Sequence, residues 1–160
     1  MARVVLINPN SPFMINQGVM PPLGLWYIAG SLTNHDVTIV DMGLGDTIPT
    51  GADVYGVTGT SVNISQIQEV IHSLRDEKGL KVIGGPHATV KANDMMEMGF
   101  DTVVRGEGEE VIKDIVEQRL TGIITTNRIT NLNNIFPDRT QEYRYHYEID
   151  KLPAVTMITS

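Results

Sequence analysis

The sequence contains no cysteine among its 160 residues. A disulfide, a thiolate nucleophile and a cysteine-ligated metal or iron–sulfur cluster are therefore excluded from this chain. Long apolar runs are also missing, since none approaches the ~18 residues that a transmembrane helix needs. The apolar start of the chain ends at Asn8-Pro9, too soon for the core of a signal peptide. We expect a cytoplasmic protein with no membrane partner.

Basic residues are scarce, with 12 Lys and Arg against 19 Asp and Glu, so the formal charge is −7. Nucleic-acid binding needs a clustered basic surface, so we expect no nucleic-acid partner. No Gly-x-Gly-x-x-Gly follows the first apolar run, and the Walker lysine is absent. The segment Gly106-Glu107-Gly108-Glu109 looks like a glycine-rich phosphate loop, but its glutamates would repel phosphate. These absences argue against a dinucleotide or nucleoside-triphosphate site.

Short apolar runs alternate with segments of helical periodicity. This alternation predicts βαβ units and an α/β fold with a parallel sheet of about five strands. The predicted strands are 4–7, 37–40, 53–58, 80–83 and 101–104, and the predicted helices are 21–32, 63–74, 90–98 and 109–120. Asn63 and Gln66 have the spacing of a capping box at the start of the second helix. Trp26 and Tyr27 lie on the apolar stripe of the first helix and are predicted to be core residues.

The pattern changes after Gly122. Residues 123–126 and 129–130 could form a hairpin around Asn127-Arg128. Tyr143, Tyr145 and Tyr147 alternate with polar residues, which predicts an edge strand or an extended tail. We therefore expect an α/β domain at 1–125 and a C-terminal extension at 126–160.

The turns after the predicted strands are the candidate binding residues, because ligands of open parallel sheets bind beyond the carboxyl ends of the strands. These turns are residues 8–11, 58–63, 84–89 and 105–109, and each is small, polar or rich in glycine. Any one of them could be a plain connection. Four on one edge favour a groove that holds a ligand. Asp41 also ends a strand, where it could bind a ribose or serve as a turn residue.

The ordered set of these segments resembles the N-terminal cobalamin-binding domain of B12-dependent radical SAM enzymes. The resemblance covers most of the chain, and no single segment of it is decisive. Its most specific segments run from Val82 through Gly84-Gly85-Pro86-His87 to Thr89 and from Val103 through Arg105-Gly106-Glu107-Gly108 to Glu109. Asn8-Pro9, the segment 21–29, the strand 37–41 and the strand 54–58 with Ser61 complete it.

This resemblance implies a flavodoxin-like (Rossmann-like) doubly wound sheet of order 2-1-3-4-5. The corrin ring of cobalamin would lie over the carboxyl edge, and its dimethylbenzimidazole tail would enter a slot that Gly84-Gly85 leaves free of side chains. Hydroxyls of Thr60 and Ser61 could bind the tail or the corrin amides. The implied cofactor-binding residues are Asn8, Pro9, Asn10, Thr58, Thr60, Ser61, Val62, Gly84, Gly85, Pro86, His87, Gly106, Glu107 and Gly108.

Two features depart from known patterns. Cobalamin domains of the methionine-synthase type carry Asp-x-His-x-x-Gly after the first strand, whereas residues 8–13 here hold no histidine. His87 could ligate cobalt, line the site or cap a helix. The family's Cys-x-x-x-Cys-x-x-Cys motif is absent, so this chain alone cannot hold the radical SAM cluster. We expect a fragment or a naturally short form, in which 127–160 lead toward a radical SAM barrel present in cis or in trans.

Several alternatives stay open at this point. The same fold could bind flavin or another nucleotide, or it could have lost its ligand and serve as an interaction domain. Glu107 could accept hydrogen bonds from corrin amides or cap the following helix. The resemblance implies that the domain has no catalytic residue of its own. It would present cobalamin to a catalytic domain, where cobalt carries a methyl group or tunes radical chemistry.

Overall fold

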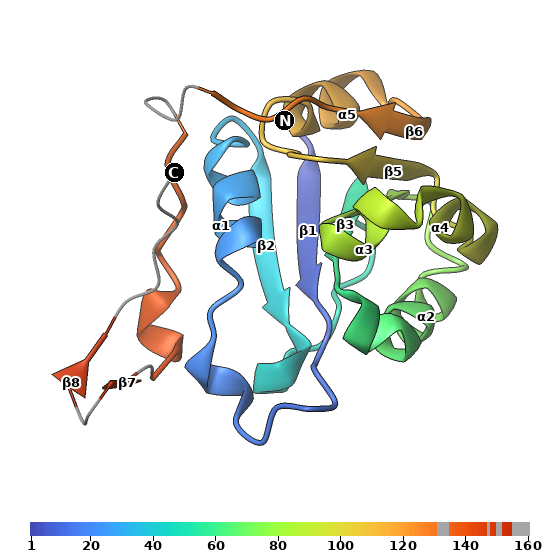
Figure 1. The fold of residues 1–160 in the computed structure, drawn as a ribbon. Coiled ribbons are helices and arrows are strands. Elements are labelled where there is room, and N and C mark those ends of the chain that lie inside the picture. The colour runs from blue at the N-terminus through green and yellow to red at the C-terminus, as the bar shows by residue number, and fades with distance from the viewer. Residues whose placement is uncertain (131–134, 147, 150–151, 155–160) are drawn as a thin grey trace.

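The computed structural model describes residues 1–130, 135–146, 148–149 and 152–154. Its main sheet is wholly parallel, with the order β2-β1-β3-β4-β5-β6 (Figure 1). The strands are β1 (Arg3–Asn8), β2 (Asp36–Asp41), β3 (Val54–Thr58), β4 (Leu80–Gly84), β5 (Thr102–Arg105) and β6 (Gly122–Thr125). The predicted doubly wound α/β fold and its order are confirmed, with one strand added at the edge.

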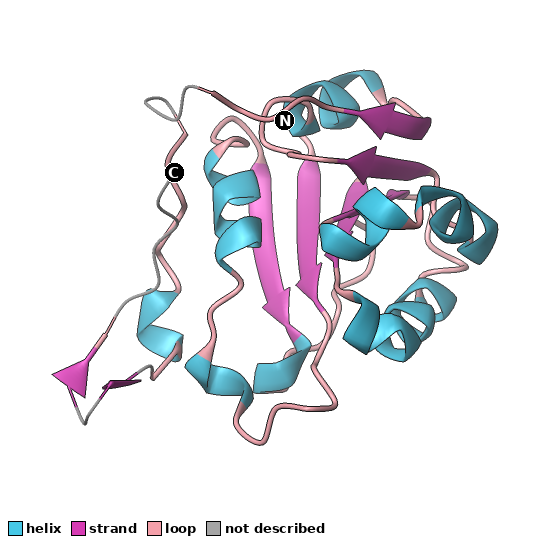
Figure 2. Cartoon of the chain, viewed as in Figure 1, coloured by secondary structure: helices cyan, strands magenta, loops and turns pink. Residues whose placement is uncertain are grey.

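Helices cover both faces of this sheet (Figure 2). One apolar core joins the sheet to α1 and α5, and a second joins the opposite face to α2, α3 and α4. The helices are α1 (Leu23–Gly30), α2 (Ile64–Ser73), α3 (Pro86–Val90), α4 (Ala92–Met98) and α5 (Ile112–Gln118), with short 3₁₀ turns at Gln17–Val19, Met42–Leu44, Ser61–Asn63 and Glu142–Arg144. The first predicted helix is therefore shorter than expected, and the segment 86–98 forms two helices.

Strand β1 shows why the apolar runs became central strands. Its four residues from Val4 to Ile7 are at most 1% exposed, and successive side chains enter the two cores in turn. A strand covered by helices on both faces has no polar side, which is why the run is apolar throughout.

The sixth strand corrects the predicted hairpin. Gly122–Thr125 pairs in parallel with β5, from Thr102↔Gly122 to Arg105↔Thr125, and residues 129–130 form no strand. The hairpin prediction was wrong because a four-residue run after a helix fits a further βαβ crossover equally well. Gly122 has φ +95° at the start of this strand, where a turn in the chain needs glycine.

The C-terminal residues 135–146, here called the strap, pack along α1. The Asp138 amide donates to the Trp26 carbonyl at 2.8 Å, and the Arg139 guanidinium lies 5.5 Å from the centre of the Trp26 ring. The Tyr145 ring meets the Trp26 ring edge-on at 5.7 Å. Trp26 is fully buried, as predicted. The strap is thus packed against the α/β domain along α1.

Of the two alternatives predicted for the tyrosines, an edge strand or an extended tail, the edge strand is wrong for Tyr143 and Tyr145. Tyr143 lies in the 3₁₀ turn Glu142–Arg144 and is 79% exposed, while Tyr145 is buried. Tyr147 lies outside the described residues. A two-stranded antiparallel pair, β7 (Glu148–Ile149) and β8 (Leu152–Pro153), follows the strap.

A polar network ties the strap to the carboxyl end of β2. Asp41 is 1% exposed, and its Oδ2 accepts from the Tyr145 hydroxyl at 2.6 Å and from Asn8 Nδ2 at 3.1 Å. Arg144 donates to both carboxylate oxygens of Asp46, at 2.7 and 2.8 Å. Burial and the hydrogen bond to Asp41 raise the pKa of the Tyr145 phenol well above 10. Asp41 is therefore a structural anchor for two distant segments.

A 3₁₀ turn, Ser61–Asn63, precedes helix α2 and carries the capping box. Thr60 is the capping residue, and its amide donates to Asn63 Oδ1 at 2.8 Å in a capping box. Asn63 is thus the third residue of the turn and not its cap, so the predicted pairing of Asn63 with Gln66 was wrong. Thr60 and Asn63 form the capping box instead, with the same separation of three residues, three positions earlier in the chain.

Candidate functional site

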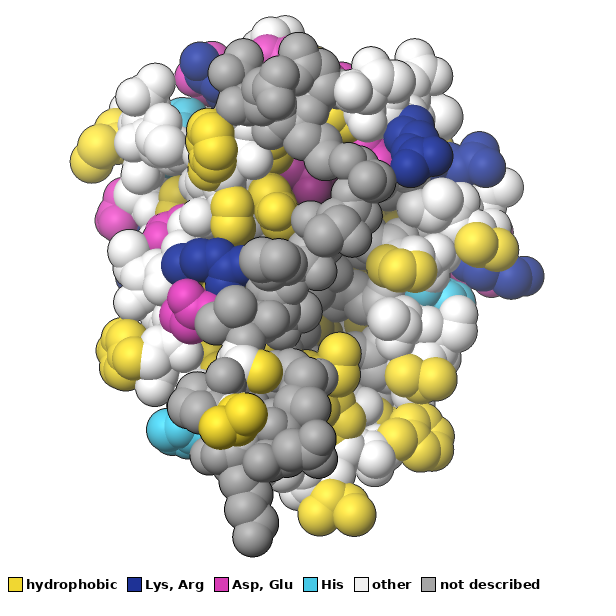
Figure 3. Space-filling model, turned by 60° about the vertical axis from the view of Figure 1, so that its left-hand side comes forward, with side chains coloured by type: hydrophobic (Ala, Val, Ile, Leu, Met, Phe, Trp, Pro, Cys, Tyr) yellow, Lys and Arg dark blue, Asp and Glu magenta, His cyan; other side chains and the backbone are white. Residues whose placement is uncertain are grey.

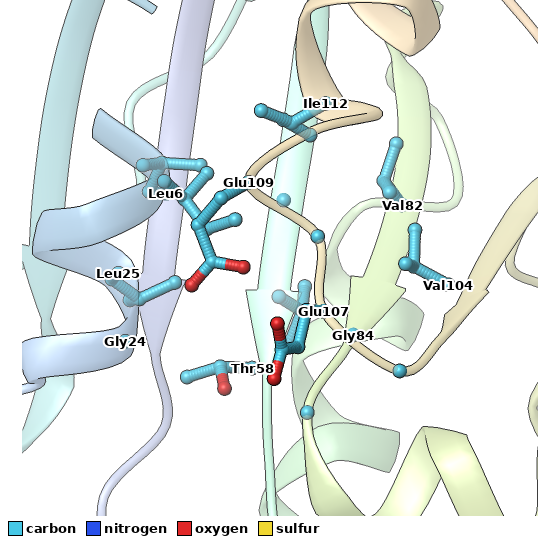
Figure 4. Close-up of a pocket in the computed structure, with 16 residues that line it drawn as sticks. Leu6, Gly24, Leu25, Thr58, Val82, Gly84, Val104, Glu107, Glu109 and Ile112 are labelled. Carbon is cyan, nitrogen blue, oxygen red and sulfur yellow. The ribbon is translucent and has the colours of Figure 1, made fainter. Parts of the chain in front are cut away.

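A cavity of about 210 Å³ opens at the carboxyl ends of the central strands, between the sheet, α1 and the turn from β5 to α5 (Figure 4). Its walls are mostly apolar side chains and glycines. The lining residues are Leu6, Gly24, Leu25, Ile28, Gly56, Val57, Thr58, Val82, Gly84, Gly85, Val104, Gly106, Glu107, Gly108, Glu109 and Ile112.

The floor of the cavity follows from strand alternation. Gly56 and Thr58 of β3 lie two residues apart and point to the same face, as do Val82 and Gly84 of β4. The register pairs Gly56 with Val82 and Thr58 with Gly84. These pairs therefore place small residues side by side where the sheet meets the cavity.

Gly84 and Gly24 keep the cavity open. A Cβ added at Gly84 would meet only Val104 Cβ within 4 Å, at 3.9 Å, and one at Gly24 would meet nothing. Side chains at these two positions would thus project into free space and fill the cavity. Glycine at these two positions therefore keeps the cavity free of side chains from α1 and from β4, as a slot for a flat ligand requires.

Gly85 and Gly106 serve the backbone instead. They have φ +95° and +97°, a region that side chains other than glycine rarely adopt. A Cβ at Gly85 would also lie 3.0 Å from Thr58 Oγ1, and one at Gly106 would lie 2.7 Å from Thr126 Oγ1. Both glycines are therefore needed for the turns that border the cavity.

The turn from β5 to α5 is held from both sides. Thr89 of α3 accepts the Gly106 amide on its Oγ1 at 3.1 Å, and the Thr126 amide donates to the Arg105 carbonyl at 2.9 Å. One carboxylate oxygen of Glu107 accepts the Ile129 amide at 2.5 Å. Because these contacts form within the protein, the cavity wall is organised before any ligand binds.

Glu109 extends from the same turn into the cavity, on the side of Leu25 (Figure 4). Burial raises the pKa of its carboxyl group, and the charges of Glu107 and Glu110 raise it further. The backbone amides of Glu109 and Gly108 act in the opposite direction but do not reverse the shift. Glu109 is thus a partly buried acid that the protein places against an apolar space.

Six of the sequence-predicted site residues line the cavity: Thr58, Gly84, Gly85, Gly106, Glu107 and Gly108. The other eight are not among its lining residues and lie at or directly after the carboxyl ends of β1, β3 and β4. They are Asn8, Pro9, Asn10, Thr60, Ser61, Val62, Pro86 and His87.

Some of the eight outer residues have partners within the protein. Asn8 donates to Asp41, and Thr60 caps the helix after β3. Ser61 Oγ and His87 Nδ1 lie 2.8 Å apart, which joins the turns after β3 and β4. Val62 is 56% exposed. These residues are not among those that line the cavity.

The list of implied cofactor-binding residues left out several cavity residues, chiefly Gly24, Gly56 and Glu109. Gly56 could have been found, because it stands two residues before Thr58 on the same strand face. Gly24 lies inside an apolar helix, where only the fold shows that it lines the cavity. Glu109 is the last residue of the predicted turn 105–109, but it also begins the predicted helix 109–120, where an exposed acid is equally suitable.

No group of three His, Asp or Glu residues within the described ranges is arranged to hold a metal ion. No helix in the part of the chain that the structure describes is long and apolar enough to cross a bilayer. On the face seen in Figure 3, the Lys and Arg side chains drawn in colour lie in small separate groups.

The family model of the B12 binding domain matches residues 16–116, which include both walls of the cavity. The solved cobalamin-dependent S-adenosylmethionine radical enzyme OxsB, with aqua-cobalamin bound, superimposes with a TM-score of 0.59 at 16% identity. That match covers 74% of this chain and 19% of the OxsB chain, and it establishes likeness of fold.

Two curated relatives match in sequence. An uncharacterized methyltransferase of Pyrococcus horikoshii is 31% identical over 133 residues, covering 72% of this chain and 29% of the relative. The bacteriochlorophyllide d C-12(1)-methyltransferase of Chlorobaculum tepidum is 26% identical over 144 residues, covering 83% and 31%. The chain thus spans less than a third of the length of either relative.

Proposed function

Because the chain belongs to the family of B12 binding domains, we propose that it holds cobalamin with the nucleotide tail in the cavity between the sheet, α1 and the β5–α5 turn. The observation that carries this proposal is the glycine-lined space itself. Gly84 and Gly24 face it from opposite sides with room for added atoms, and Gly56 lies on its floor. A planar base needs a narrow, preformed and mainly apolar slot of this kind.

The corrin ring would then lie over the carboxyl edge of the sheet. The turns after β1, β3 and β4 carry the polar groups of Asn10, Ser61 and His87 at this edge. Phe13 and Ile15 on the β1–α1 loop are 76% and 106% exposed and offer apolar contacts to a macrocycle. We propose that these turns bind the amide side chains and the rim of the ring, while the bound cobalt supplies the chemistry of methyl transfer or radical tuning.

A flavin or another phosphate-bearing nucleotide is the weaker candidate. The cavity has two carboxylates, Glu107 and Glu109, and no Lys, Arg or His among its described lining residues. A phosphate in this space would meet like charges and no positive partner. Cobalamin can place its base in the cavity and leave its phosphodiester outside.

The catalytic partner belongs to the proposal as well. The two curated relatives are methyltransferases and extend well beyond the matched region. We propose that the domain presents cobalamin to a radical SAM catalytic domain, in cis or in trans, because no cysteine in this chain could hold the cluster.

Titration with hydroxocobalamin, followed in the visible spectrum, tests the proposal, and Gly84→Val sharpens it. The new Cβ would meet no backbone, since only Val104 Cβ lies within 4 Å of it, and the two methyl groups beyond it would take up space at a position that lines the cavity. We expect affinity to fall at least tenfold, about 1.4 kcal/mol, with Gly84→Ala in between.

Thr125→Val is the matched control, because it alters a β-branched residue at the end of β6 that does not line the cavity. It should bind as the unaltered protein does. Absence of any spectral change with the unaltered protein would refute cobalamin binding and favour a domain that works without this ligand. Unchanged affinity in Gly84→Val would show that the tail binds elsewhere.

A further inference from the structure

The two carboxylates of the cavity have different surroundings. Glu107 already accepts a hydrogen bond from the Ile129 amide. Glu109 is held partly buried beside Leu25, and the hydrogen-bonding neighbours of its carboxyl group are the backbone amides of Gly108 and of Glu109 itself. A carboxylate against an apolar wall is costly to keep unless a donor completes its hydrogen bonds. Among the described residues, no Lys, Arg or His lines the cavity to supply that donor.

We infer that Glu109 determines which ligand end the cavity accepts: its carboxylate takes a hydrogen bond from an O–H or N–H donor on an uncharged nucleoside, and it excludes phosphate. This inference rests on the proposed function. In cobalamin the ribose hydroxyl is a donor of this kind, whereas the phosphodiester carries charge that Glu109 would repel.

The geometry supports selection rather than a purely structural role. Glu109 follows turn residues 105–107, which Thr89, Thr126 and Ile129 hold by hydrogen bonds, so its backbone is kept beside the cavity. The next residue, Glu110, is exposed and does not line the cavity. The neighbouring glutamates therefore provide a natural pair, one facing the ligand space and one facing solvent.

The test compares hydroxocobalamin with aquacobinamide, the corrinoid that lacks the nucleotide, by titrating the unaltered protein, Glu109→Gln and Glu110→Gln. Glutamine keeps the shape of the side chain but replaces a charge-assisted hydrogen bond by a weaker one. We expect Glu109→Gln to bind hydroxocobalamin about tenfold more weakly and aquacobinamide unchanged. Glu110→Gln should bind both as the unaltered protein does.

Adenosine monophosphate serves as the probe for phosphate exclusion. We expect the unaltered protein to show no binding at millimolar concentration and Glu109→Gln to bind measurably, since one of the two repelling charges is gone and the other, Glu107, is already engaged by the Ile129 amide. Equal binding of hydroxocobalamin by Glu109→Gln and the unaltered protein would overturn the inference, and so would an equal loss for both corrinoids. If the unaltered protein bound neither corrinoid, the proposed function itself would fail.

Discussion

Glu107 and Glu109 stand two residues apart on one turn, yet they meet different partners. Glu107 satisfies the Ile129 amide from a segment about twenty residues later, and Glu109 faces the cavity. The sequence predicted a binding turn here, but it could not assign the two acids to these roles. The partner of Glu107 depends on where the chain passes after β6, which local periodicity does not reveal.

The raised pKa of Glu109 predicts how stability depends on pH. A carboxyl group whose pKa is higher in the folded protein than in the unfolded chain binds more protons when folded, so it lowers stability as pH rises through that interval. Glu109→Gln removes this effect. We expect the ligand-free variant to unfold at a higher temperature than the unaltered protein at pH 7.

The difference in unfolding temperature between Glu109→Gln and the unaltered protein should shrink as pH falls. It should disappear below the ordinary carboxyl pKa of 4.5, where Glu109 is protonated in both the folded and the unfolded chain. Thermal unfolding followed by circular dichroism between pH 4 and pH 8 measures it, with Glu110→Gln as control. A variant that is less stable than the unaltered protein at pH 7 would contradict the assignment of Glu109 as a destabilising acid.

The glycines show how far single residues could be predicted. Gly84 and Gly85 were expected to open a slot together. In the structure the two glycines have different roles, since Gly84 faces free space while Gly85 provides a backbone turn at φ +95°. Strand position was enough to place both at the site. Only the fold could separate a missing side chain from a required conformation.

At the scale of elements, the strap and α1 form the least expected contact. A Cβ added at Gly30, the last residue of α1, would lie 1.8 Å from the Phe136 carbonyl oxygen. The chain passes so close to the helix that only glycine fits. No periodicity in the sequence indicates this approach, because it joins residues more than a hundred positions apart.

Gly30→Ala therefore tests whether the strap stabilises the domain. We expect the strap to shift away, which weakens the buried hydrogen bond between Tyr145 and Asp41 and lowers the free energy of unfolding by about 1–3 kcal/mol. Trp26 is the only tryptophan, so its fluorescence reports the loss of the Tyr145 and Arg139 contacts directly.

Gly24→Ala in the same helix is the control for this stability measurement. Its Cβ meets nothing within 4 Å, and alanine favours helix by up to about 1 kcal/mol over glycine. It should leave the fluorescence of the ligand-free protein unchanged and the stability equal or higher. If Gly30→Ala behaved in the same way, the close packing of the strap on α1 would be wrong.

The elements themselves were predictable where packing and pattern agree. Apolar runs became central strands because helices cover both faces of the sheet. The prediction failed for β6 and for the segment 143–145, where short runs fit more than one pairing. A four-residue run can be a hairpin arm or an edge strand, and only the neighbouring strand decides between them.

At the scale of the whole molecule, the fold brings the cavity together from segments far apart in the chain. Leu6 of β1, Gly24 of α1, Gly84 of β4 and Glu109 of the β5–α5 turn all line one space. Parallel connections return every strand to the same edge, so the turns that carry polar and glycine residues meet there. This is why an ordered set of short segments could predict the site although no single segment did.

The central claim is that the cavity holds the base of cobalamin. A structure of the protein with hydroxocobalamin bound tests it most directly. We predict the dimethylbenzimidazole between Gly84 and Gly24, above Gly56, with the corrin ring beyond the carboxyl ends of the strands. A complex in which the cavity stays free of the ligand, or in which the base lies against another face of the sheet, would contradict this account.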